Sequence, residues 1–587
     1  MCKSRLHWRD SRQHFAFLVR EMIIQSIRLL MLLTLLSVMI LTSCGDMSGT
    51  DETSADLVVV NARIWTADSA NPWADALAVR GETLAFVGSN EDAVTLAKSA
   101  ALLIDAEGQF VVPGFIDAHV HFLDGGFRLS SVQLRDAATP SEFIERVGAY
   151  AESTPAGTWI TGGDWDHEQW GGELPSRNWI DSVTTDHPVW VNRLDGHMAL
   201  ANSLALKLAG IDDDVRDVDG GTIVRDRETL TGVFKDNAMG LVTPHIPNPT
   251  DALEDRALDA AMTYVAEQGV TSVHDAGYDG GSIGSNAGLE TFRRAHLQDR
   301  LKTRIYASLP LSRHAELHDL VGSESRGDHW LRIGLLKGFV DGSLGSHTAA
   351  FLEPFTDAPD DTGLLVNTEA DLYSWISAAD KNGLHVMTHA IGDRAIRILL
   401  DIYERVAREN GPRDRRFRME HAQHIDPEDL DRFAELGVIA SMQPYHAIDD
   451  GRWAEKVIGP DRIKTTYAFR NLLDNGARLA FGSDWYVAPP TPLEGIYAAV
   501  TRRTLDGLND AGWVPEEKIS VEEALRAYTI DAAFASFEEN IKGSLEIGKL
   551  ADFAMIDADL TQVDPPDIRE AKVVLTVVGG EVVFRAP

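Results

Sequence analysis

The stretch Pro113-Gly114-Phe115-Ile116-Asp117-Ala118-His119-Val120-His121 decides the fold that the sequence predicts. The apolar run of residues 111–118 predicts a β-strand, and two histidines follow at its end. Successive side chains of a strand alternate between its faces, so His119 and His121 point to the same side. Because neutral imidazole is the commonest metal ligand, the pair is a candidate start of a metal site.

Further apolar runs follow this strand, and helix-like stretches separate the later ones. Strands that alternate with helices predict a parallel sheet, and eight such units predict a (β/α)8 TIM barrel of class α/β. The gap between the first and second strands is too long for one helix. We therefore expect an insertion at about 156–236 that covers the active-site face. The predicted strands are residues 111–118, 270–275, 304–308, 333–340, 384–389, 417–420, 438–442 and 478–482.

Short β-rich runs lie on both sides of this alternating region. Three precede it within residues 57–87, and three follow it within residues 552–584. Gly579-Gly580 separates the last two runs and is typical of a hairpin turn. We expect residues 56–112 and 540–587 to form one small β-sandwich domain, with residues 113–539 as the barrel.

The first 44 residues have the pattern of a targeting segment. Residues 27–41 are mostly apolar, a length that suits a signal-peptide core and is short for a transmembrane helix. Leu41-Thr42-Ser43-Cys44 resembles a bacterial lipoprotein box. We expect residues 1–44 to be a lipoprotein-like signal peptide and residues 45–55 a linker. The protein would then be exported and lipid-anchored to a bacterial membrane, facing the periplasm or the cell exterior. An uncleaved anchor and a start at Met22 stay open.

Composition limits the partners and the kind of site. The net charge of −36 repels phosphates, so nucleic-acid binding is not expected and membrane contact is expected only through the lipid anchor. The two cysteines, Cys2 and Cys44, both lie in the targeting segment. A metal site in the body of the chain must therefore use His, Asp, Glu or Lys. We expect a small-molecule substrate, and the sequence leaves an oligomer open.

Metal-binding residue types recur at the ends of later strands. Lys337 lies in the apolar fourth strand, where a charged ammonium is costly to bury. His389 ends the fifth strand, His421 the sixth and Asp484 the eighth. Each alone could be an ordinary polar strand end. Because the ends of barrel strands share one face, we expect these residues to converge with the first histidine pair.

This set resembles the amidohydrolase superfamily, in particular its amidohydrolase-3 branch. The resemblance covers nearly the whole chain from Asp56 onward. Its most specific phrases are residues 112–119, His389-Ala390-Ile391-Gly392-Asp393-Arg394-Ala395, Glu420-His421-Ala422-Gln423 and Gly482-Ser483-Asp484.

The resemblance implies one or two divalent metal ions, usually zinc. Two cations need anionic oxygen between them, which a lysine carboxylated by carbon dioxide supplies. A single-metal site with a hydrogen-bonded lysine amine is the alternative. The implied ligands are His119 and His121 for the first metal, His389 and His421 for the second, carboxylated Lys337 as the bridge, and Asp484 for the first metal and for proton transfer.

Four further residues are weaker candidates for substrate contact. His197 lies in a stretch, residues 195–199, that resembles a substrate-facing part of this branch. His274 ends the second strand, Trp165 lies in the insertion and Tyr445 follows the seventh strand. A structural hydrogen bond for His274 and simple packing for Trp165 are the alternatives.

We expect hydrolysis of a non-peptide carbon–nitrogen bond in a small amide, N-acyl or N-formyl substrate by metal-activated water, with Asp484 handling protons. Ester or lactone hydrolysis at the same metals is an alternative, because a fold does not fix the reaction. A catalytically inactive barrel that only binds a ligand is a third reading. The intact ligand set argues against it.

Overall fold

The structure is a computed structural model that describes residues 54–277 and 287–587. The predicted signal peptide and nearly all of the predicted linker lie outside these residues. Among the helices that the structure describes, none has both the length and the apolar character needed to cross a membrane.

Eight parallel strands form the central barrel, and their order in the sheet follows their order in the chain. This arrangement confirms the predicted TIM barrel. Seven of the predicted strands match the observed ones to within two residues at each end. The strands are β8 (Phe115–Val120), β15 (Val270–Asp275), β16 (Arg304–Pro310), β17 (Leu331–Phe339), β18 (His385–Ala390), β19 (Arg418–His421), β20 (Ile439–Met442) and β21 (Arg478–Phe481).

The barrel closes through the residues that follow β21. The backbone N–H of Asp484 donates to the carbonyl of His119 over 2.7 Å, and that of His121 donates to the carbonyl of Trp485 over 2.6 Å. Val120 and Trp485 form a parallel bridge between the same segments. The hydrogen bonds that close the barrel are therefore made by candidate metal ligands, and they fix these residues beside one another.

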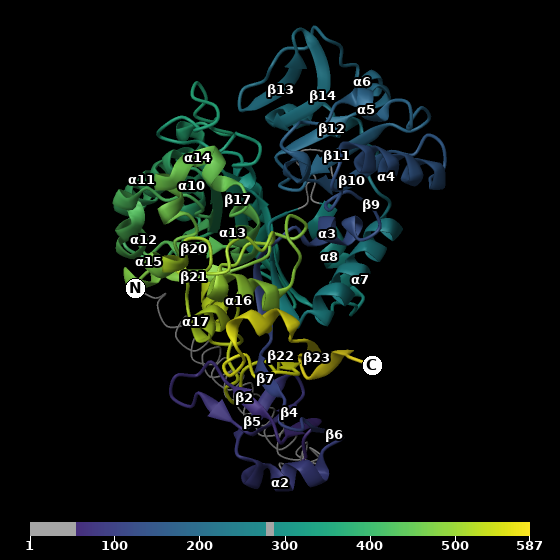
Figure 1. The fold of residues 1–587 in the computed structure, drawn as a ribbon. Helices are drawn as coiled ribbons and strands as arrows, with labels where there is room; N and C mark the ends of the chain where they lie inside the picture. Colours follow the sequence, from purple (N-terminus) through teal and green to yellow (C-terminus); the bar gives the residue numbers. More distant parts are fainter. Residues whose placement is uncertain (1–53, 278–286) are drawn as a thin grey trace, which may run out of the picture. The chain divides into compact units, whose positions relative to one another are not determined.

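Helices surround the barrel strands (Figure 1). In α11, the residues Ile396, Leu399, Leu400 and Tyr403 recur at helical spacing and are buried, so one face of this helix packs on the barrel. The main outer helices are α7 (Asp251–Glu267), α8 (Ala287–Leu297), α9 (His314–Glu324), α10 (Glu369–Lys381), α11 (Asp393–Asn410), α12 (Leu430–Leu436), α15 (Phe469–Asp474), α16 (Pro492–Thr501), α17 (Val521–Ala527) and α18 (Ile530–Ala535).

The first predicted strand, residues 111–118, is wrong in its extent because it is two strands. β7 (Phe110–Pro113) pairs with strands of the terminal β-rich region, and β8 begins after Gly114. The N–H of Gly114 donates to Asp552 in that region, whereas the N–H of Phe115 donates to Gly269 before β15. The chain thus passes from one sheet to the other at Gly114.

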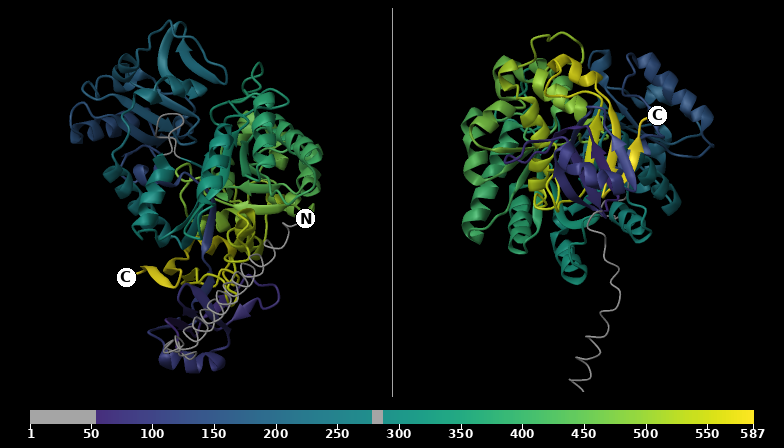
Figure 2. Two further views of the ribbon diagram at one scale, coloured as in Figure 1. Left: turned by 180° about the vertical axis from the view of Figure 1, so that it is seen from behind. Right: turned by 90° about the horizontal axis from the view of Figure 1, so that it is seen from below.

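Strands from both ends of the described chain form two further sheets. One has the order β5-β4-β1-β6 and the other β24-β23-β22-β7-β2-β3. Figure 2 shows the purple N-terminal strands beside the yellow C-terminal ones, which confirms the predicted β-sandwich of both termini. The strands are β1 (Leu57–Val60), β2 (Arg63–Trp65), β3 (Trp73–Ala74), β4 (Ala76–Arg80), β5 (Thr83–Gly88), β6 (Leu102–Asp105), β22 (Phe553–Ile556), β23 (Val573–Val578) and β24 (Glu581–Arg585).

An additional sheet lies between barrel strands β8 and β15 in the chain, as expected for an insertion. Its order is β13-β14-β12-β11-β10-β9. It starts at Val132, earlier than the expected residue 156, because the intervening helix α4 (Pro140–Ser153) has an apolar face that also suits a barrel helix. The strands are β9 (Val132–Gln133), β10 (Ile160–Trp165), β11 (Val189–Arg193), β12 (Met198–Ala201), β13 (Gly221–Asp226) and β14 (Thr229–Asp236).

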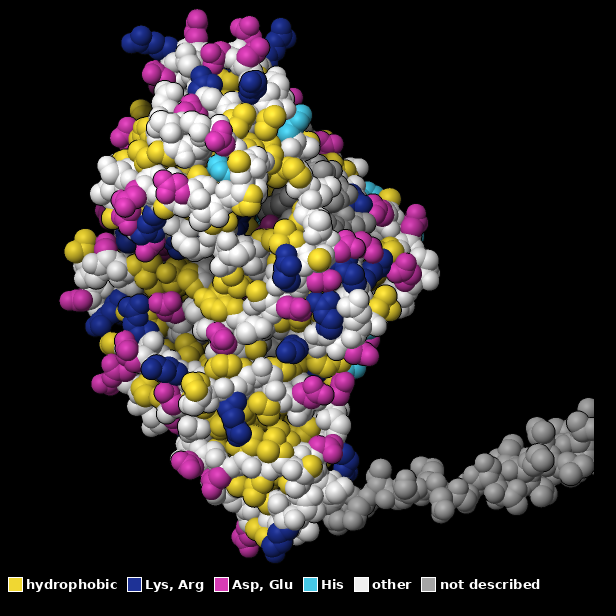
Figure 3. All heavy atoms as spheres, turned by 90° about the vertical axis from the view of Figure 1, so that its right-hand side faces the viewer, with side chains coloured by type: hydrophobic (Ala, Val, Ile, Leu, Met, Phe, Trp, Pro, Cys, Tyr) yellow, Lys and Arg dark blue, Asp and Glu magenta, His cyan; other side chains and the backbone are white. Residues whose placement is uncertain are grey.

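Charged side chains of both signs are distributed over the surface. On the face in Figure 3, Asp and Glu are interspersed with Lys and Arg. Elsewhere on the surface, charged groups pair locally, as Arg432 in α12 does with Asp401 over 2.7 Å. On this face, the acidic excess is therefore spread out.

Candidate metal centre

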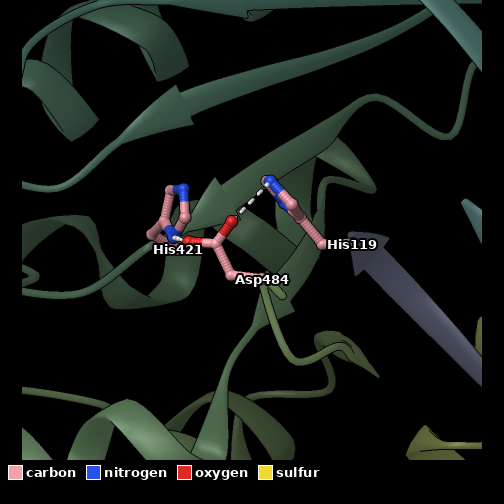
Figure 4. Close-up of side chains that lie close together, drawn as sticks. All are labelled: His119, His421 and Asp484. Atoms are coloured by element: carbon pink, nitrogen blue, oxygen red, sulfur yellow. Dashed lines mark ion pairs between the residues drawn. The ribbon is translucent and has the colours of Figure 1, made fainter. Parts of the chain in front are cut away.

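Three candidate ligands from separate barrel strands meet in a buried cluster (Figure 4). They are His119, His421 and Asp484, and one possible ligand atom of each lies within 4.8 Å of the others. Asp484 lies between the two imidazoles. Its Oδ1 is 3.4 Å from Nε2 of His119, and its Oδ2 is 4.0 Å from Nδ1 of His421.

His121 and Lys337 complete the group around Asp484. Nε2 of His121 lies 3.4 Å from Oδ1 of Asp484, and Nζ of Lys337 lies 2.9 Å from Nε2 of His119. Oδ1 of Asp484 is buried and accepts no hydrogen bond from the described residues, although two imidazole nitrogens face it. An orphaned carboxylate oxygen among imidazole nitrogens is a donor set that fits a divalent cation.

His389 lies on the His421 side of this cluster, with 4.5 Å between the two ring centroids. Nε2 of His389 is 3.0 Å from the carbonyl oxygen of Gly342, and Nδ1 of His421 is 2.8 Å from Oε1 of Gln443. Each ring can donate an N–H to that oxygen and keep the lone pair of its other nitrogen. Each ring therefore keeps one nitrogen that could bind a metal.

Glu420 determines which nitrogen of His119 faces the centre. Its Oε2 lies 2.5 Å from Nδ1 of His119, so Nδ1–H donates to the carboxylate and Nε2 keeps its lone pair. Arg418 holds this carboxylate with Nε 2.9 Å from Oε1 and Nη2 3.2 Å from Oε2, and both side chains are fully buried. Glu420 stands in the motif Glu420-His421-Ala422-Gln423, but this role was not predicted from the sequence. A carboxylate directly before a candidate ligand was the available signal.

Burial and neighbouring charges set the protonation states that a metal needs. Burial lowers the pKa of His119 to about 4, helped by the charge of Lys337. Burial also lowers the pKa of His389 and holds that of His421 well below its usual value. Burial alone would raise the pKa of Asp484, but the nearby imidazoles, first that of His119, outweigh it and hold this pKa well below normal. Neutral imidazoles and an ionised carboxylate are the metal-binding forms.

Two of these residues have left-handed backbone conformations. The φ angle is 70° at His421 and 60° at Asp484. Such values are uncommon for residues other than glycine, and they cluster at functional sites because the surrounding structure has to maintain them. The extended backbone, and with it the regular alternation of side chains, therefore ends at both candidate ligands.

The centre lies between two cavities, one of about 890 Å³ and one of about 50 Å³. Both are lined by His389, His421 and Asp484. The larger one also contacts insertion residues such as Trp159 and Trp190. Residues of the insertion therefore form part of the wall of the larger cavity beside the centre.

Of the weaker candidates, His197 lies at the centre. Its ring centroid is 5.0 Å from that of His389, and its Nδ1 is 2.7 Å from Oδ1 of Asp236. It lines both cavities. An insertion residue thus lies against a candidate ligand of the barrel.

For the other three weaker candidates, His274, Trp165 and Tyr445, substrate contact stays a prediction. None of them is among the described residues that line the two cavities. His274 is fully buried, with Nδ1 2.9 Å from Nη1 of Arg418, so it has the structural role given as its alternative. The indole N–H of Trp165 donates to Val191 inside the insertion core. Tyr445, in α13 (Pro444–Asp450), packs against the main hydrophobic core.

Comparisons with known proteins agree with this geometry. The model of the amidohydrolase family matches residues 102–584. The protein LONG AFTER FAR-RED 3 of Arabidopsis thaliana is 41% identical over 537 residues, which cover 90% of this chain and 92% of that protein. N-substituted formamide deformylase of Arthrobacter pascens is 30% identical over 556 residues, which cover 89% and 97% of the two chains.

A solved structure is similar over the same range. It is an uncharacterized metal-dependent hydrolase from Pyrococcus furiosus, with a TM-score of 0.66 and 29% identity over 86% of this chain and 100% of the other. The family match begins at β6 and covers the barrel, the insertion and the C-terminal β-rich strands, whereas β1 to β5 precede it. The chain therefore belongs to the amidohydrolase family of hydrolases.

Proposed function

We propose that the protein hydrolyses a carbon–nitrogen bond other than a peptide bond, in a small amide, N-acyl or N-formyl compound. The observation that carries this proposal is the buried Oδ1 of Asp484, which lies 3.4 Å from Nε2 of both His119 and His121 and accepts no hydrogen bond from the described residues. The relative named N-substituted formamide deformylase supports the choice of bond.

We propose zinc as the metal. His119, His121 and Asp484 would hold the first ion, and His389 and His421 a second. A bound divalent cation would polarise the substrate carbonyl and make a water molecule more acidic. The position of the Lys337 amine beside His119 supports its carboxylation, because a neutral or anionic group suits this place better than an ammonium next to two cations.

Asp484 is the proposed catalytic residue for proton transfer. Its ionised carboxylate accepts a proton from the attacking water as the carbon–oxygen bond forms, and it passes this proton to the leaving nitrogen as the carbon–nitrogen bond breaks. A carboxylic acid and an amine are the products. Glu420 keeps His119 in the tautomer whose Nε2 faces the centre.

The test uses the full chain loaded with Zn²⁺ and incubated with N-benzylformamide. We expect formate and benzylamine in equal amounts, measured by NMR, and loss of turnover after chelation. Turnover of phenyl acetate or a lactone without any amide would overturn the proposal in favour of ester hydrolysis. If the chain binds zinc stoichiometrically but hydrolyses neither amides nor esters, the result would favour a protein that binds a ligand without catalysis.

The state of Lys337 and the number of metals have a separate test. Native mass spectrometry is expected to show one added carbon dioxide on the chain, lost in Lys337→Ala, together with about two zinc ions. An unmodified lysine with about one zinc ion would support the single-metal alternative.

We also propose that the protein is exported and held at a membrane by lipid on Cys44. The support is the sequence Leu41-Thr42-Ser43-Cys44. Metabolic labelling with a palmitate analogue is expected to mark the wild-type chain and not Cys44→Ala. Equal labelling of both chains would contradict the anchor.

A further inference from the structure

A tyrosine of the barrel lies in the wall of the larger cavity, beside the metal centre. Tyr486 follows Asp484 by two residues and is 4% exposed. Its ring centroid is 5.6 Å from that of His121, and it lines the larger cavity together with His121, His197 and Asp484. A phenol group, which can donate a hydrogen bond at neutral pH, therefore stands next to a proposed ligand of the first metal.

The hydroxyl end of Tyr486 reaches the insertion. A Cβ atom on Gly196 would come within 2.8 Å of the hydroxyl oxygen, and the φ angle of Gly196 is 73°, so glycine permits this close approach. Gly196 directly precedes His197, whose ring centroid is 5.0 Å from that of His389. The hydroxyl therefore lies at the level of the centre, between the barrel and the insertion.

Two arginines hold Tyr486 in this position. Nη2 of Arg135 donates to the carbonyl oxygens of Tyr486 over 2.7 Å and of Val487 over 2.6 Å. Arg128 is the last residue of α3 (Phe122–Arg128), and its guanidinium carbon is 4.3 Å from the centroid of the Tyr486 ring. A donor that is fixed before the reaction needs little reorganisation during it, which is what a group that stabilises a transition state requires.

Arg128 also influences the hydroxyl itself. Burial alone would lower the pKa of Arg128, but the Asp164 carboxylate and then the Tyr486 hydroxyl outweigh this effect and raise the pKa. A guanidinium has donors and no acceptor, so the phenol oxygen accepts from Arg128 and its own proton points elsewhere. A hydrogen bond that the phenol oxygen accepts polarises the hydroxyl and strengthens the bond that the hydroxyl donates.

We infer that Tyr486 is a further catalytic residue, whose hydroxyl donates a hydrogen bond to the carbonyl oxygen of the substrate. This inference rests on the proposed hydrolysis. As water adds its oxygen to the acyl carbon, an electron pair of the carbonyl moves onto the carbonyl oxygen, and the Tyr486 hydroxyl stabilises the developing charge. The pair then re-forms the carbonyl, the carbon–nitrogen bond breaks, and the nitrogen takes the proton that Asp484 carries. Tyr486 keeps its own proton throughout.

Tyr486→Phe tests the inference, because it removes the hydroxyl and keeps the ring. With the zinc-loaded full chain and N-benzylformamide, we expect kcat to fall about 10²- to 10³-fold, the usual cost of losing one donor to an oxyanion. KM, zinc content and the denaturant midpoint of unfolding are expected to change little, since the ring contacts with His121 and Arg128 remain.

Tyr497→Phe is the matched control. Tyr497, in α16, is 5% exposed and also has a guanidinium on its ring, with the carbon of Arg569 4.9 Å from the ring centroid. It is not among the described residues that line either cavity. We expect kcat of this variant to equal that of the wild type.

Equal kcat values of Tyr486→Phe and Tyr497→Phe would overturn the inference and leave the proposed reaction intact. A raised KM with unchanged kcat, or a loss of zinc, would also overturn it, since Tyr486 would then act in substrate binding or at the metal. If the wild type hydrolyses phenyl acetate and no amide, the proposed function fails, and the same comparison of variants is made on the ester carbonyl. The two failures are therefore distinguishable.

A second measurement applies if Tyr486→Phe does not fold. Incorporation of 3-fluorotyrosine at position 486 makes the phenol a stronger hydrogen-bond donor and adds little volume. At neutral pH, where this phenol keeps its proton, kcat is expected to rise, and the same replacement at position 497 is expected to leave kcat unchanged. An unchanged or lower kcat with 3-fluorotyrosine at position 486 would overturn the inference.

Discussion

The barrel and the insertion contribute to the centre in different ways. The barrel supplies the candidate ligands at the ends of its strands, where backbone hydrogen bonds such as that from Asp484 to His119 fix their positions. The insertion supplies His197 and the aromatic wall with Trp159 and Trp190. We therefore expect the proposed reaction to depend on the barrel and the choice of substrate on the insertion. Changes in the barrel should then affect every substrate, and changes in the insertion only some.

The largest effect is expected for Asp484→Asn, on the barrel side. The asparagine cannot accept a proton, so kcat should fall by about 10²- to 10⁴-fold for all amides. Zinc content, measured by elemental analysis, is expected to stay largely intact because the imidazoles remain. Full activity in this variant would remove Asp484 from the proposed mechanism.

The next effect is expected for Glu420→Gln, which also belongs to the barrel. Glutamine can donate to Nδ1 of His119 and so favour the tautomer whose Nε2 is protonated. We expect zinc affinity, measured by chelator competition, to fall roughly 10- to 100-fold. Glu517→Gln is the matched control, because Glu517 is another buried glutamate, bonded to Asn471. Equal affinity of the two variants would contradict the role of Glu420.

A smaller and more selective effect is expected for His197→Gln, on the insertion side. Loss of one substrate hydrogen bond, worth about 1 kcal/mol, lowers kcat/KM roughly fivefold to tenfold. Zinc content should not change, unlike in Glu420→Gln. His245→Gln serves as the control because His245 is exposed. A loss of zinc in His197→Gln would show that insertion and barrel share the metal site and would break the comparison.

The smallest effect concerns stability and not turnover. His424 is buried, and burial lowers its pKa to about 3. The unfolded chain takes up this proton near pH 6.5, so the stabilisation from the neutral imidazole is complete above that pH and is lost as the pH falls toward 3. In His424→Gln, the free energy of unfolding should therefore fall about 1 kcal/mol less between pH 6.5 and 5.5.

Denaturant unfolding at the two pH values measures this difference. His424 keeps Nδ1 2.9 Å from Oγ1 of Thr466, and glutamine can also bond to that hydroxyl. The same pH dependence in variant and wild type would mean that His424 accepts its proton in the folded state.

The sequence predicted the barrel and the candidate ligands at its strand ends well. Residues 270–275 were predicted as a strand and form β15 with the same ends, because their apolar run is short and buried on both faces. The candidate ligands could be found because strand ends share one face of a barrel. His119, His421 and Asp484 meet there. The sequence did not predict which side chains hold those ligands in place. The hydrogen bond from His119 to Glu420, for example, joins strands that are far apart in the chain.

The insertion side was less predictable for a physical reason. Trp165 is an aromatic residue of the kind that often contacts a substrate, but its side chain packs in the hydrophobic core of its own sheet. Both faces of this sheet are covered by hydrophobic clusters, so the local sequence pattern does not distinguish them. The start of the insertion was missed because β9 has only two residues. The cavities depend on how the insertion packs on the barrel, and the sequence of neither segment shows where they meet.

The barrel closure also has a consequence for the time at which the centre can exist. The N–H of Ser483 donates to Oδ1 of Asp117 over 2.8 Å, between residues 366 apart in the chain. A ribosome needs on the order of tens of seconds to add that many residues. During that interval His119 and His121 have been synthesised, but Asp484, whose carboxylate lies beside them in the folded protein, has not. A chain that ends before Asp484 therefore cannot act by the proposed mechanism, and the centre can form only after the last barrel strand has been made.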